Sequence, residues 1–234
     1  MKRTVAVIIP SYNETENLKI LLMSIIERLP QGKIFIVDDS SEEEKTKLRK
    51  IIATQNGDIS LISREKKDGR GSAVILGLKK AFVDKNILYF IEMDADLSHN
   101  PNEIPKLLDA SKNADVVVGS RYKKESNIKN WPLRRVILSR IFNFLLNILL
   151  GLGLSDYTNG FRLYNRSAVK FVTSIRLREK GFIALSEIAY KLHKNGFKFT
   201  EVPISFTDRK NGKSNAGIKE HWDALYGVVR IRFT

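Results

Sequence analysis

The stretch ILYFIEMDADLSH, residues 87–99, decides the fold class of this protein. Its first seven residues are nearly all apolar and predict a buried β-strand over residues 87–93, and acidic residues follow at once. Other short runs rich in β-branched residues predict strands over residues 4–9, 33–37, 59–62 and 115–118. Amphipathic stretches between them predict helices over residues 14–29, 42–54, 70–83 and 102–111. This alternation is typical of an α/β fold whose parallel sheet is covered by helices.

Polar segments follow each of these predicted strands. They read PSYNE after Ile9, DDSS after Val37, SREKKDGRGS after Ile62, DADLSH after Met93 and GSRY after Val118. Open parallel sheets bind ligands beyond the carboxyl ends of their strands, so we expect these segments to line one site. The second half of the chain is less regular, with a predicted helix over residues 186–194 and a strand-like segment, EVPISF, over residues 201–206.

Composition narrows the range of functions. The 234 residues include 40 Lys and Arg against 26 Asp and Glu, a net charge of +14, and no cysteine. The lack of cysteine excludes thiol catalysis, zinc-thiolate sites and a disulfide scaffold, and it favours an enzyme in or facing the cytosol. The positive charge suits nucleic acid, an anionic membrane or phosphorylated small molecules. No linker or repeat divides the sequence, so residues 1–234 are predicted to form one domain.

The longest apolar stretch, VILSRIFNFLLNILLGLGL over residues 136–154, is interrupted by polar residues. Ser139, Asn143 and Asn147 recur every four residues and form a narrow polar stripe on a helix, beside Arg140. An ordinary core helix is one interpretation, but the basic flank WPLRR favours a helix on a membrane surface, in a region of about residues 131–154. The N-terminal apolar run is too short for a cleaved signal, so export is not expected.

Asp94 and Asp96 stand one residue apart at the end of the strand predicted over residues 87–93. Two carboxylates this close repel each other unless a cation lies between them, and hard oxygen ligands favour Mg²⁺ or Mn²⁺. Ser98 is a further candidate ligand, directly or through water. The alternatives are a solvated acidic turn for the two aspartates and a simple turn residue for His99.

Other residues at the strand ends are candidates for nucleotide and phosphate binding. Asp38 and Asp39 suit hydrogen bonds to a ribose or a base edge, although Asp39, Ser40 or Ser41 could each cap the next helix. Tyr12 and Glu14 could stack on and hydrogen-bond to a base, or Glu14 could complement a helix N-terminus. Candidate phosphate ligands are the basic loop residues Arg121, Arg134, Arg135, Arg209 and Lys213. GRGS lacks the GxGxxG spacing, which excludes a dinucleotide-binding fingerprint.

The ordered set VIIPSYNE, IVDDSS, MDADLSH, GSRY, SDYTNGFRLY and EVPISFTDRKNGKS, from Val5 to about Ser214, resembles the dolichol-phosphate mannose synthases. These are inverting glycosyltransferases of family 2 with the GT-A fold. The resemblance implies a Rossmann-like, mostly parallel mixed sheet flanked by helices. It also implies transfer of a hexose, typically mannose from GDP-mannose, to the phosphate of dolichol or a related polyprenol at the cytosolic face of a membrane.

The resemblance also implies roles for particular residues. The nucleoside would be held by Pro10, Tyr12, Glu14, Val37 and Asp39, and the donor site would also include Asp68, Ala95 and Lys213. Mg²⁺ or Mn²⁺ on the diphosphate would be bound by Asp94, Asp96 and Ser98, and the phosphates of donor and acceptor by Arg121, Arg135 and Arg209. Two positions depart from the family pattern: Asn215 stands where a Lys is common, and Arg70 replaces an apolar residue.

The chemistry of such a transfer can be argued from the acceptor. A phosphate monoester is already anionic near neutral pH, so no protein base is expected. The transition state instead needs neutralisation of the leaving diphosphate and alignment of two repelling phosphates. In-line attack inverts the sugar and gives a β-linked product. Asp156 and Glu187 are candidates for contacts to sugar hydroxyls, or alternatively for pairing with Arg162 or capping a helix.

Several alternatives remain open at this point. The donor could be UDP-glucose or another UDP-hexose, because the motifs do not read the base. A non-catalytic basic module that binds nucleic acid or a membrane is a remote alternative, and a nucleotidyltransferase would not require the apolar stretch at 136–154. Nucleic acid is therefore not expected as a partner. The final LYGVVRIRFT could be a natural end or precede a transmembrane segment, and a small membrane protein could anchor the chain.

Overall fold

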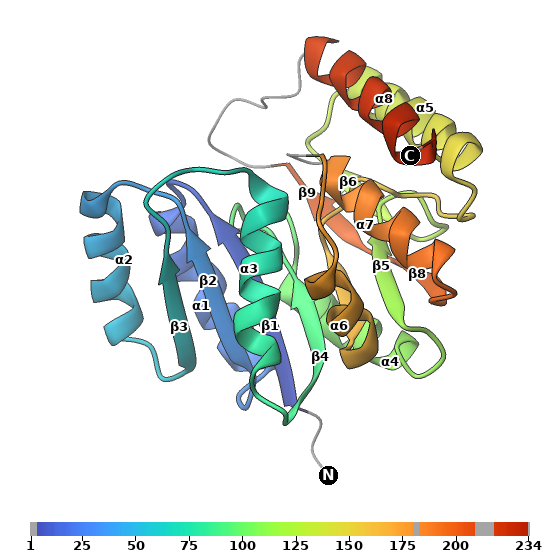
Figure 1. The fold of residues 1–234 in the computed structure, drawn as a ribbon. Helices are drawn as coiled ribbons and strands as arrows, with labels where there is room; N and C mark the ends of the chain where they lie inside the picture. The colour runs from blue at the N-terminus through green and yellow to red at the C-terminus, as the bar shows by residue number, and fades with distance from the viewer. Residues whose placement is uncertain (1–3, 180–182, 209–217, 234) are drawn as a thin grey trace.

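The computed structural model describes residues 4–179, 183–208 and 218–233, and for residues 218–225 it describes the backbone only. A seven-stranded sheet has the strand order β3-β2-β1-β4-β7-β5-β8 (Figure 1). Its strands are β1 (Thr4–Ser11), β2 (Lys33–Asp38), β3 (Asp58–Ser63), β4 (Ile87–Glu92), β5 (Val116–Ser120), β7 (Arg162–Asn165) and β8 (Phe199–Pro203). Neighbours are parallel except at β7, which is antiparallel to both β4 and β5. The prediction of a mixed, mostly parallel sheet is confirmed.

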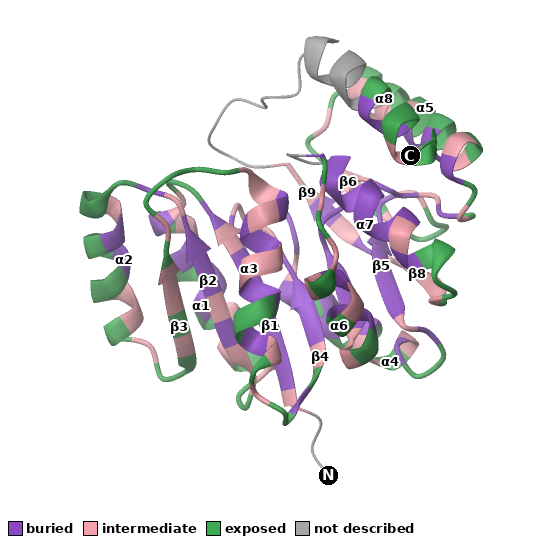
Figure 2. Cartoon of the chain, viewed as in Figure 1, coloured by how far each residue is buried: buried purple, intermediate pink, exposed green. Residues whose placement is uncertain are grey.

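Helices cover both faces of this sheet (Figure 1). One face carries α3 (Arg70–Phe82), α6 (Arg166–Ser174) and α7 (Ile183–Lys194), and the other carries α1 (Thr15–Arg28), α2 (Glu42–Ala53), the short 3₁₀ turn η1 (Pro101–Glu103) and α4 (Ile104–Ala110). Successive strand residues point to opposite faces, so β1 supplies Ala6 and Ile8 to one core and Val5, Val7 and Ile9 to the other. The strand ends are thereby held between two packed layers (Figure 2).

The elements of the first half lie where the sequence predicts them, with ends shifted by at most two residues. The second half differs more. Residues 201–206 do not form one strand: β8 ends at Pro203, and β9 (Ser205–Thr207) pairs with β6 (Asn127–Lys129) in a separate two-stranded sheet. Ile204 links the two strands, since its N–H donates to the Ser120 carbonyl and its own carbonyl accepts from Asn127.

Strand β7 was not predicted, and it is the strand that makes the sheet mixed. It lies within the SDYTNGFRLY motif and separates β4 from β5. The helix predicted over residues 186–194 is α7, whose described part begins earlier, at Ile183.

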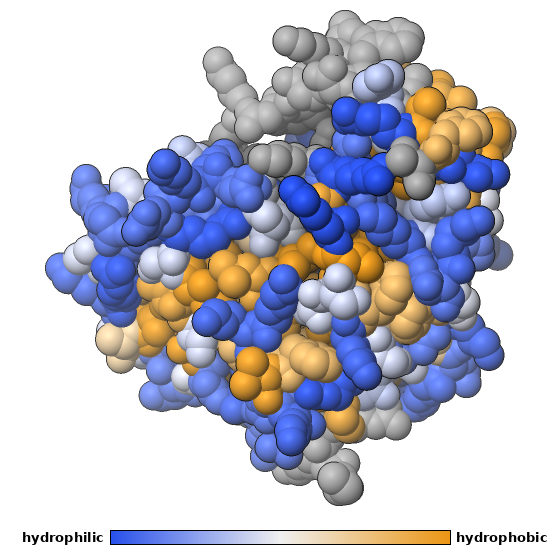
Figure 3. Space-filling model, viewed as in Figure 1, coloured by the Kyte–Doolittle hydropathy of each residue, from blue (hydrophilic) through white to orange (hydrophobic). Residues whose placement is uncertain are grey.

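The apolar stretch forms α5 (Leu133–Leu150), which lies beside α8 (Ile218–Phe233) outside the main sheet (Figure 1). Only Asn143, Leu146 and Leu150 of α5 are buried. Its large apolar residues on the outer side remain exposed, among them Leu133, Ile137, Leu138, Ile141, Phe144 and Ile148 (Figures 2 and 3). Among the helices of the described residues, none combines the length and apolar character needed to cross a bilayer.

Candidate active site

A pocket of about 260 Å³ opens at the carboxyl ends of β1, β2 and β4. Its lining includes seven residues predicted for donor or metal binding: Pro10, Tyr12, Glu14, Asp39, Asp94, Ala95 and Asp96. The loop before α3 adds Lys67 and Gly69, the first residue of α3 adds Arg70, and Asp68 lies in the same loop. Val37 is close by in sequence but its side chain is fully buried against α3. The fold therefore gathers four separate loops around one pocket, as expected for ligand sites of open α/β sheets.

Asp39 is held by an arginine that the sequence analysis did not single out. Arg64, in the loop after β3, donates through Nε and Nη2 to the two carboxylate oxygens of Asp39. Its Nη1 also donates to Ser72 Oγ of α3 at 2.7 Å. The carboxylate is thereby fixed at the pocket wall. Asp39 does not cap α2, because Ser41 Oγ accepts from the backbone N–H of Glu44.

The segment from Asp94 to His99 is a tight turn with its own hydrogen bonds. The Asp94 N–H donates to Nδ1 of His99 at 3.0 Å, and the Ser98 N–H donates to Oδ1 of Asp96 at 3.1 Å. Because Nδ1 accepts, the neutral His99 ring carries its proton on Nε2, which lies 2.8 Å from Asn159 Oδ1. His99 is buried and its ring stacks on Phe161. It therefore stabilises the turn through its side chain and is more than a simple turn residue.

The oxygen atoms around this turn fit a divalent cation. Asp94 and Asp96 contribute carboxylates to the pocket, and the buried Ser98 Oγ finds no hydrogen-bond partner within the part of the chain that the structure describes. Within the described ranges no group of three or more His, Cys, Asp or Glu side chains surrounds one metal position. In enzymes that act on phosphate compounds, Mg²⁺ is usually bound by one or two carboxylates, and water and substrate phosphates complete its coordination. The donor set therefore matches a metal that binds together with a diphosphate.

Arg70 enters the same pocket from the first turn of α3. Its Nε and Nη2 donate to Oδ1 of Asp94 at 3.0 and 2.6 Å, and its Nη1 donates to Glu92 Oε1. Burial by itself lowers the pKa of the guanidinium, but attraction to Asp94 and Glu92 outweighs this and raises the pKa above its ordinary value. The arginine that departs from the family pattern is thus a permanent cation in contact with a predicted metal ligand.

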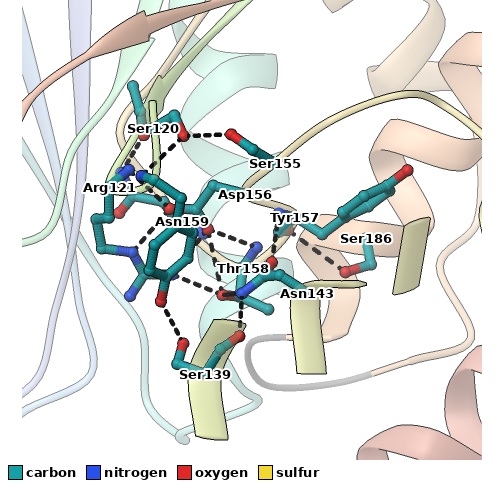
Figure 4. A network of polar contacts seen from close by, with 12 residues as sticks. Ser120, Arg121, Ser139, Asn143, Ser155, Asp156, Tyr157, Thr158, Asn159 and Ser186 are labelled. Atoms are coloured by element: carbon teal, nitrogen blue, oxygen red, sulfur yellow. Dashed lines mark hydrogen bonds and ion pairs between the residues drawn. The ribbon is translucent and has the colours of Figure 1, made fainter. Parts of the chain in front are cut away.

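Arg121, predicted as a phosphate ligand, lies in a dense polar network between the GSRY and SDYTN segments (Figure 4). Its Nε and Nη2 donate to the two carboxylate oxygens of Asp156, each at 2.7 Å, and Nη2 also reaches Thr158 Oγ1. Both side chains of this pair are almost completely buried. Burial alone raises the pKa of Asp156, but the charge and hydrogen bonds of Arg121 outweigh it, and the net pKa is lowered.

The polar stripe of α5 belongs to this network. Asn143 Oδ1 accepts from the Tyr157 N–H at 2.7 Å, and Asn147 Oδ1 accepts from the Tyr157 hydroxyl and the Gly153 N–H. Ser139 Oγ accepts from the Tyr122 hydroxyl. The stripe therefore faces the protein together with Leu146 and Leu150, while most other large apolar residues of the helix are exposed.

Arg135, at the start of α5, is the second described arginine of the predicted phosphate set. Its Nη1 lies 2.8 Å from Asp208 Oδ2, and its guanidinium lies 4.1 Å from the centre of the Trp131 ring. Arg121 approaches the same ring at 5.3 Å, so the two cations converge on Trp131 from different elements. Arg134 is exposed on α5. Arg209, Lys213 and Asn215 lie outside the described residues.

The predicted alternative of pairing with Arg162 is wrong for both Asp156 and Glu187. Arg162 instead donates to three backbone carbonyls, of Tyr157, Asn159 and Leu185. Glu187 accepts from the backbone N–H groups of Arg178 and Glu179, with Lys191 as its ion-pair partner. Glu187 is thus tied into the scaffold by these bonds, as Asp156 is by Arg121.

Sequence reasoning missed Arg64, Glu92 and Asn159 as parts of the site. The signal was available for Glu92, which is a carboxylate inside an otherwise apolar strand and therefore requires a buried partner. No comparable signal marks Arg64 or Asn159, whose partners are brought together only by the packing of distant loops.

Comparison with known proteins agrees with this geometry. Residues 6–173 match the model of the family described as glycosyl transferase family 2. The chain is 35% identical over 225 residues to the polyprenol monophosphomannose synthase of Mycolicibacterium smegmatis, covering 95% of this chain and 84% of that protein. It is 32% identical over 226 residues to the undecaprenyl-phosphate mannosyltransferase of Micrococcus luteus, covering 97% and 93%.

Solved structures support the fold independently. The glucosyl-3-phosphoglycerate synthase of Mycobacterium tuberculosis, crystallised with Mn²⁺, uridine diphosphate and phosphoglyceric acid, superposes with a TM-score of 0.69. The superposition covers 99% of this chain and 79% of that one at 15% sequence identity, a level that shows a shared fold. Together with the family match and the two mannosyltransferase relatives, this establishes that the chain belongs to glycosyl transferase family 2.

Proposed function

We propose that this protein transfers mannose from GDP-mannose to the phosphate of a polyprenol, giving a β-linked polyprenyl-phosphate mannose. The observation that carries the proposal is the 32–35% identity, over nearly the whole chain, to two proteins named for polyprenyl-phosphate mannose synthesis. The pocket that joins Tyr12, Asp39, Asp94 and Asp96 supports it, because it combines an aromatic face, a fixed carboxylate and a pair of metal-type ligands.

In this proposal the donor lies in the 260 Å³ pocket. The nucleoside contacts Tyr12, Glu14 and Asp39, and Arg64 keeps the Asp39 carboxylate in position for a ribose or base edge. Asp94, Asp96 and Ser98 would hold Mg²⁺ or Mn²⁺. When bound, the metal neutralises charge that develops on the leaving diphosphate.

The acceptor phosphate is proposed to bind near Arg121 and Arg135. These two cations meet at Trp131, whose buried indole N–H has no hydrogen-bond partner among the described residues. Asp156 offsets the charge of Arg121 and also fixes the orientation of its guanidinium. A fixed cation aligns an anion with less reorganisation than a mobile one. The phosphate monoester needs no protein base, because it is already anionic near neutral pH.

The polyprenol is proposed to approach along α5. The outer side of this helix exposes Ile141, Phe144 and Ile148, and Figure 3 shows an orange patch in the region of α5. A pocket of about 390 Å³ beside α5 has a cationic wall, Arg140, and apolar walls that include Phe144 and Leu154. This combination suits a lipid with a phosphate head. We place the protein at the cytosolic face of a membrane, held by α5, by a small anchoring partner or by a further membrane segment.

The test is a radiolabelled transfer assay with polyprenyl phosphate in detergent. GDP-mannose, UDP-glucose and UDP-N-acetylglucosamine are offered in turn, with Mn²⁺ or with EDTA. Label should enter the lipid phase from GDP-mannose in the presence of metal only. Transfer from a UDP-sugar instead would replace the donor while keeping the reaction class, and no transfer from any donor by folded protein would overturn the proposal.

A further inference from the structure

The contacts of Arg70 are unusual for its place in the fold. It occupies the first position of α3, directly after Gly69. The N-terminus of a helix carries a partial positive charge, so a cation there is unfavourable unless anions offset it. Two carboxylates do so, Glu92 at the end of β4 and Asp94 two residues later. The arginine thus bridges the sheet core and the predicted metal turn.

Glu92 is the fixed end of this bridge. Its side chain is completely buried, and its two oxygens have different partners: Oε1 accepts from Arg70, and Oε2 accepts from the Tyr164 hydroxyl at 3.0 Å. A buried carboxylate with donors on both oxygens does not rotate without breaking a hydrogen bond. The guanidinium of Arg70 is consequently held at one end by a rigid acceptor in the sheet.

Gly160 leaves the space that the guanidinium fills. A Cβ atom at this position would lie 2.1 Å from Nη2 of Arg70, closer than any real Cβ contact, and 3.3 Å from Oδ1 of Asp94. The absence of a side chain at Gly160 therefore leaves room for the guanidinium, whose Nε and Nη2 both donate to a single oxygen of Asp94.

We propose that Arg70, anchored by Glu92 and confined by Gly160, is a positioning residue that fixes the Asp94 carboxylate in the orientation required for the divalent cation. The inference rests on the proposed metal site and goes beyond it, because it names the residue that orients one of the proposed ligands. Two N–H groups of Arg70 donate hydrogen bonds to Oδ1 of Asp94, so the orientation of this carboxylate is set before a cation binds. Outer residues that orient a metal ligand typically contribute about 10- to 100-fold to metal affinity or activity.

The test compares Mn²⁺ binding by wild type and by the double variant Arg70→Leu/Glu92→Gln. This variant removes both charges together and keeps an acceptor for Tyr164, so no uncompensated charge is buried. Free Mn²⁺ is followed by electron paramagnetic resonance during titration, in the presence of GDP or of UDP, whichever stabilises the wild type against heat. We expect the dissociation constant for Mn²⁺ to rise by about 10- to 100-fold, with metal-free nucleotide binding unchanged.

Two further variants separate positioning from charge. Lys79→Leu removes an exposed cation from the last turn of the same helix, outside the pocket lining, and should leave Mn²⁺ affinity within about twofold of wild type. Gly160→Ala keeps every charge but displaces Arg70, so it should weaken Mn²⁺ binding, and it should add little in the double-variant background.

Specific results would overturn the proposal. Wild-type Mn²⁺ affinity in a folded double variant would show that Asp94 needs no positioning, while leaving the proposed transfer intact. Equal loss of nucleotide binding in EDTA would show that Arg70 acts on the nucleotide directly. Failure of the wild type itself to bind Mn²⁺ with either nucleotide would remove the metal site and the inference with it, and the transfer assay in EDTA would then test the proposed function separately.

Discussion

The helices that cover the main sheet and the helix α5 differ in how much of their apolar surface they bury. In α1 and α3 the apolar residues face the sheet, and Leu18, Leu22 and Leu78 are completely buried. In α5 the polar stripe faces the protein, and Ile141 and Phe144 are 51% and 64% exposed. In Figure 2 the central strands are largely purple, whereas much of α5 is green.

This difference shows what each region is built to contact. Apolar surface drives α1 and α3 onto the sheet, so the donor half completes its own core. Side-chain hydrogen bonds from Asn143 and Asn147 hold α5 to the SDYTN segment, which leaves its apolar surface for another apolar phase. A membrane surface is the proposed phase, and the acceptor lipid would arrive from it.

The largest effect on stability is expected where the two regions meet. Asp156→Asn leaves the buried Arg121 without its counter-charge, and loss of one partner of a buried pair costs about 3–5 kcal/mol. Urea unfolding at neutral pH measures this difference. The exposed Asp109→Asn on α4 serves as the control and should change stability by less than about 0.5 kcal/mol.

The same variant carries a pH prediction. The pKa of Asp156 is lowered in the folded state, so its stabilising effect is fully present above the unfolded value of about 3.9 and is lost as pH falls through the folded pKa. The stability gap between wild type and Asp156→Asn should therefore be constant near neutrality and shrink below about pH 4. A gap that widens in acid would contradict the assigned pairing.

Asp96→Asn tests the chemistry of the donor half alone. We expect transfer activity to fall by about 10²–10³-fold, because the variant weakens electrostatic stabilisation of the leaving diphosphate. The thermal midpoint without ligands should stay near that of wild type. Transfer at the wild-type rate with unchanged metal dependence would remove Asp96 from the proposed site.

Gly77→Ala tests how closely α3 packs on the sheet. A Cβ here would lie 2.6 Å from Cγ2 of Ile8 and 3.1 Å from Cγ2 of Val37. Overpacking of this kind typically costs about 1–3 kcal/mol. Replacing Gly by Ala in a helix gains about 1 kcal/mol in helix propensity. The cost exceeds the gain when the sheet cannot move to make room for the added Cβ atom. We expect net destabilisation in urea, whereas Lys80→Ala on the exposed side of the same helix should be neutral.

The smallest effect concerns the outward side of α5. Phe144→Ser should weaken binding to anionic liposomes about tenfold, since partial burial of an aromatic side chain contributes roughly 1.4 kcal/mol. Nucleotide binding and thermal stability should be unchanged. Met23→Ser, on an exposed position of α1, removes comparable apolar surface from the donor half. If both variants lose the same liposome affinity, the exposed apolar side of α5 has no special role in binding to the membrane.

The sequence predicted the donor half well because its signals are local. Five short apolar runs, each followed by polar residues, specify parallel strands and the edge where ligands bind, and the fold then brings Tyr12, Asp39, Asp94 and Asp96 to one pocket. The polar stripe of α5 was also visible, since a period of four residues places Ser139, Asn143 and Asn147 on one side of a helix.

Only the tertiary structure decided which partners these residues have. The sequence could not show that the stripe faces the protein, that Asp156 pairs with Arg121, or that Arg70 lies between Glu92 and Asp94. The contacts of Arg70 and Arg121 join positions 22 to 35 residues apart. Periodicity fixes the side of a helix on which a residue lies. The partner on that side depends on how distant loops pack, and that follows from the burial of both cores together.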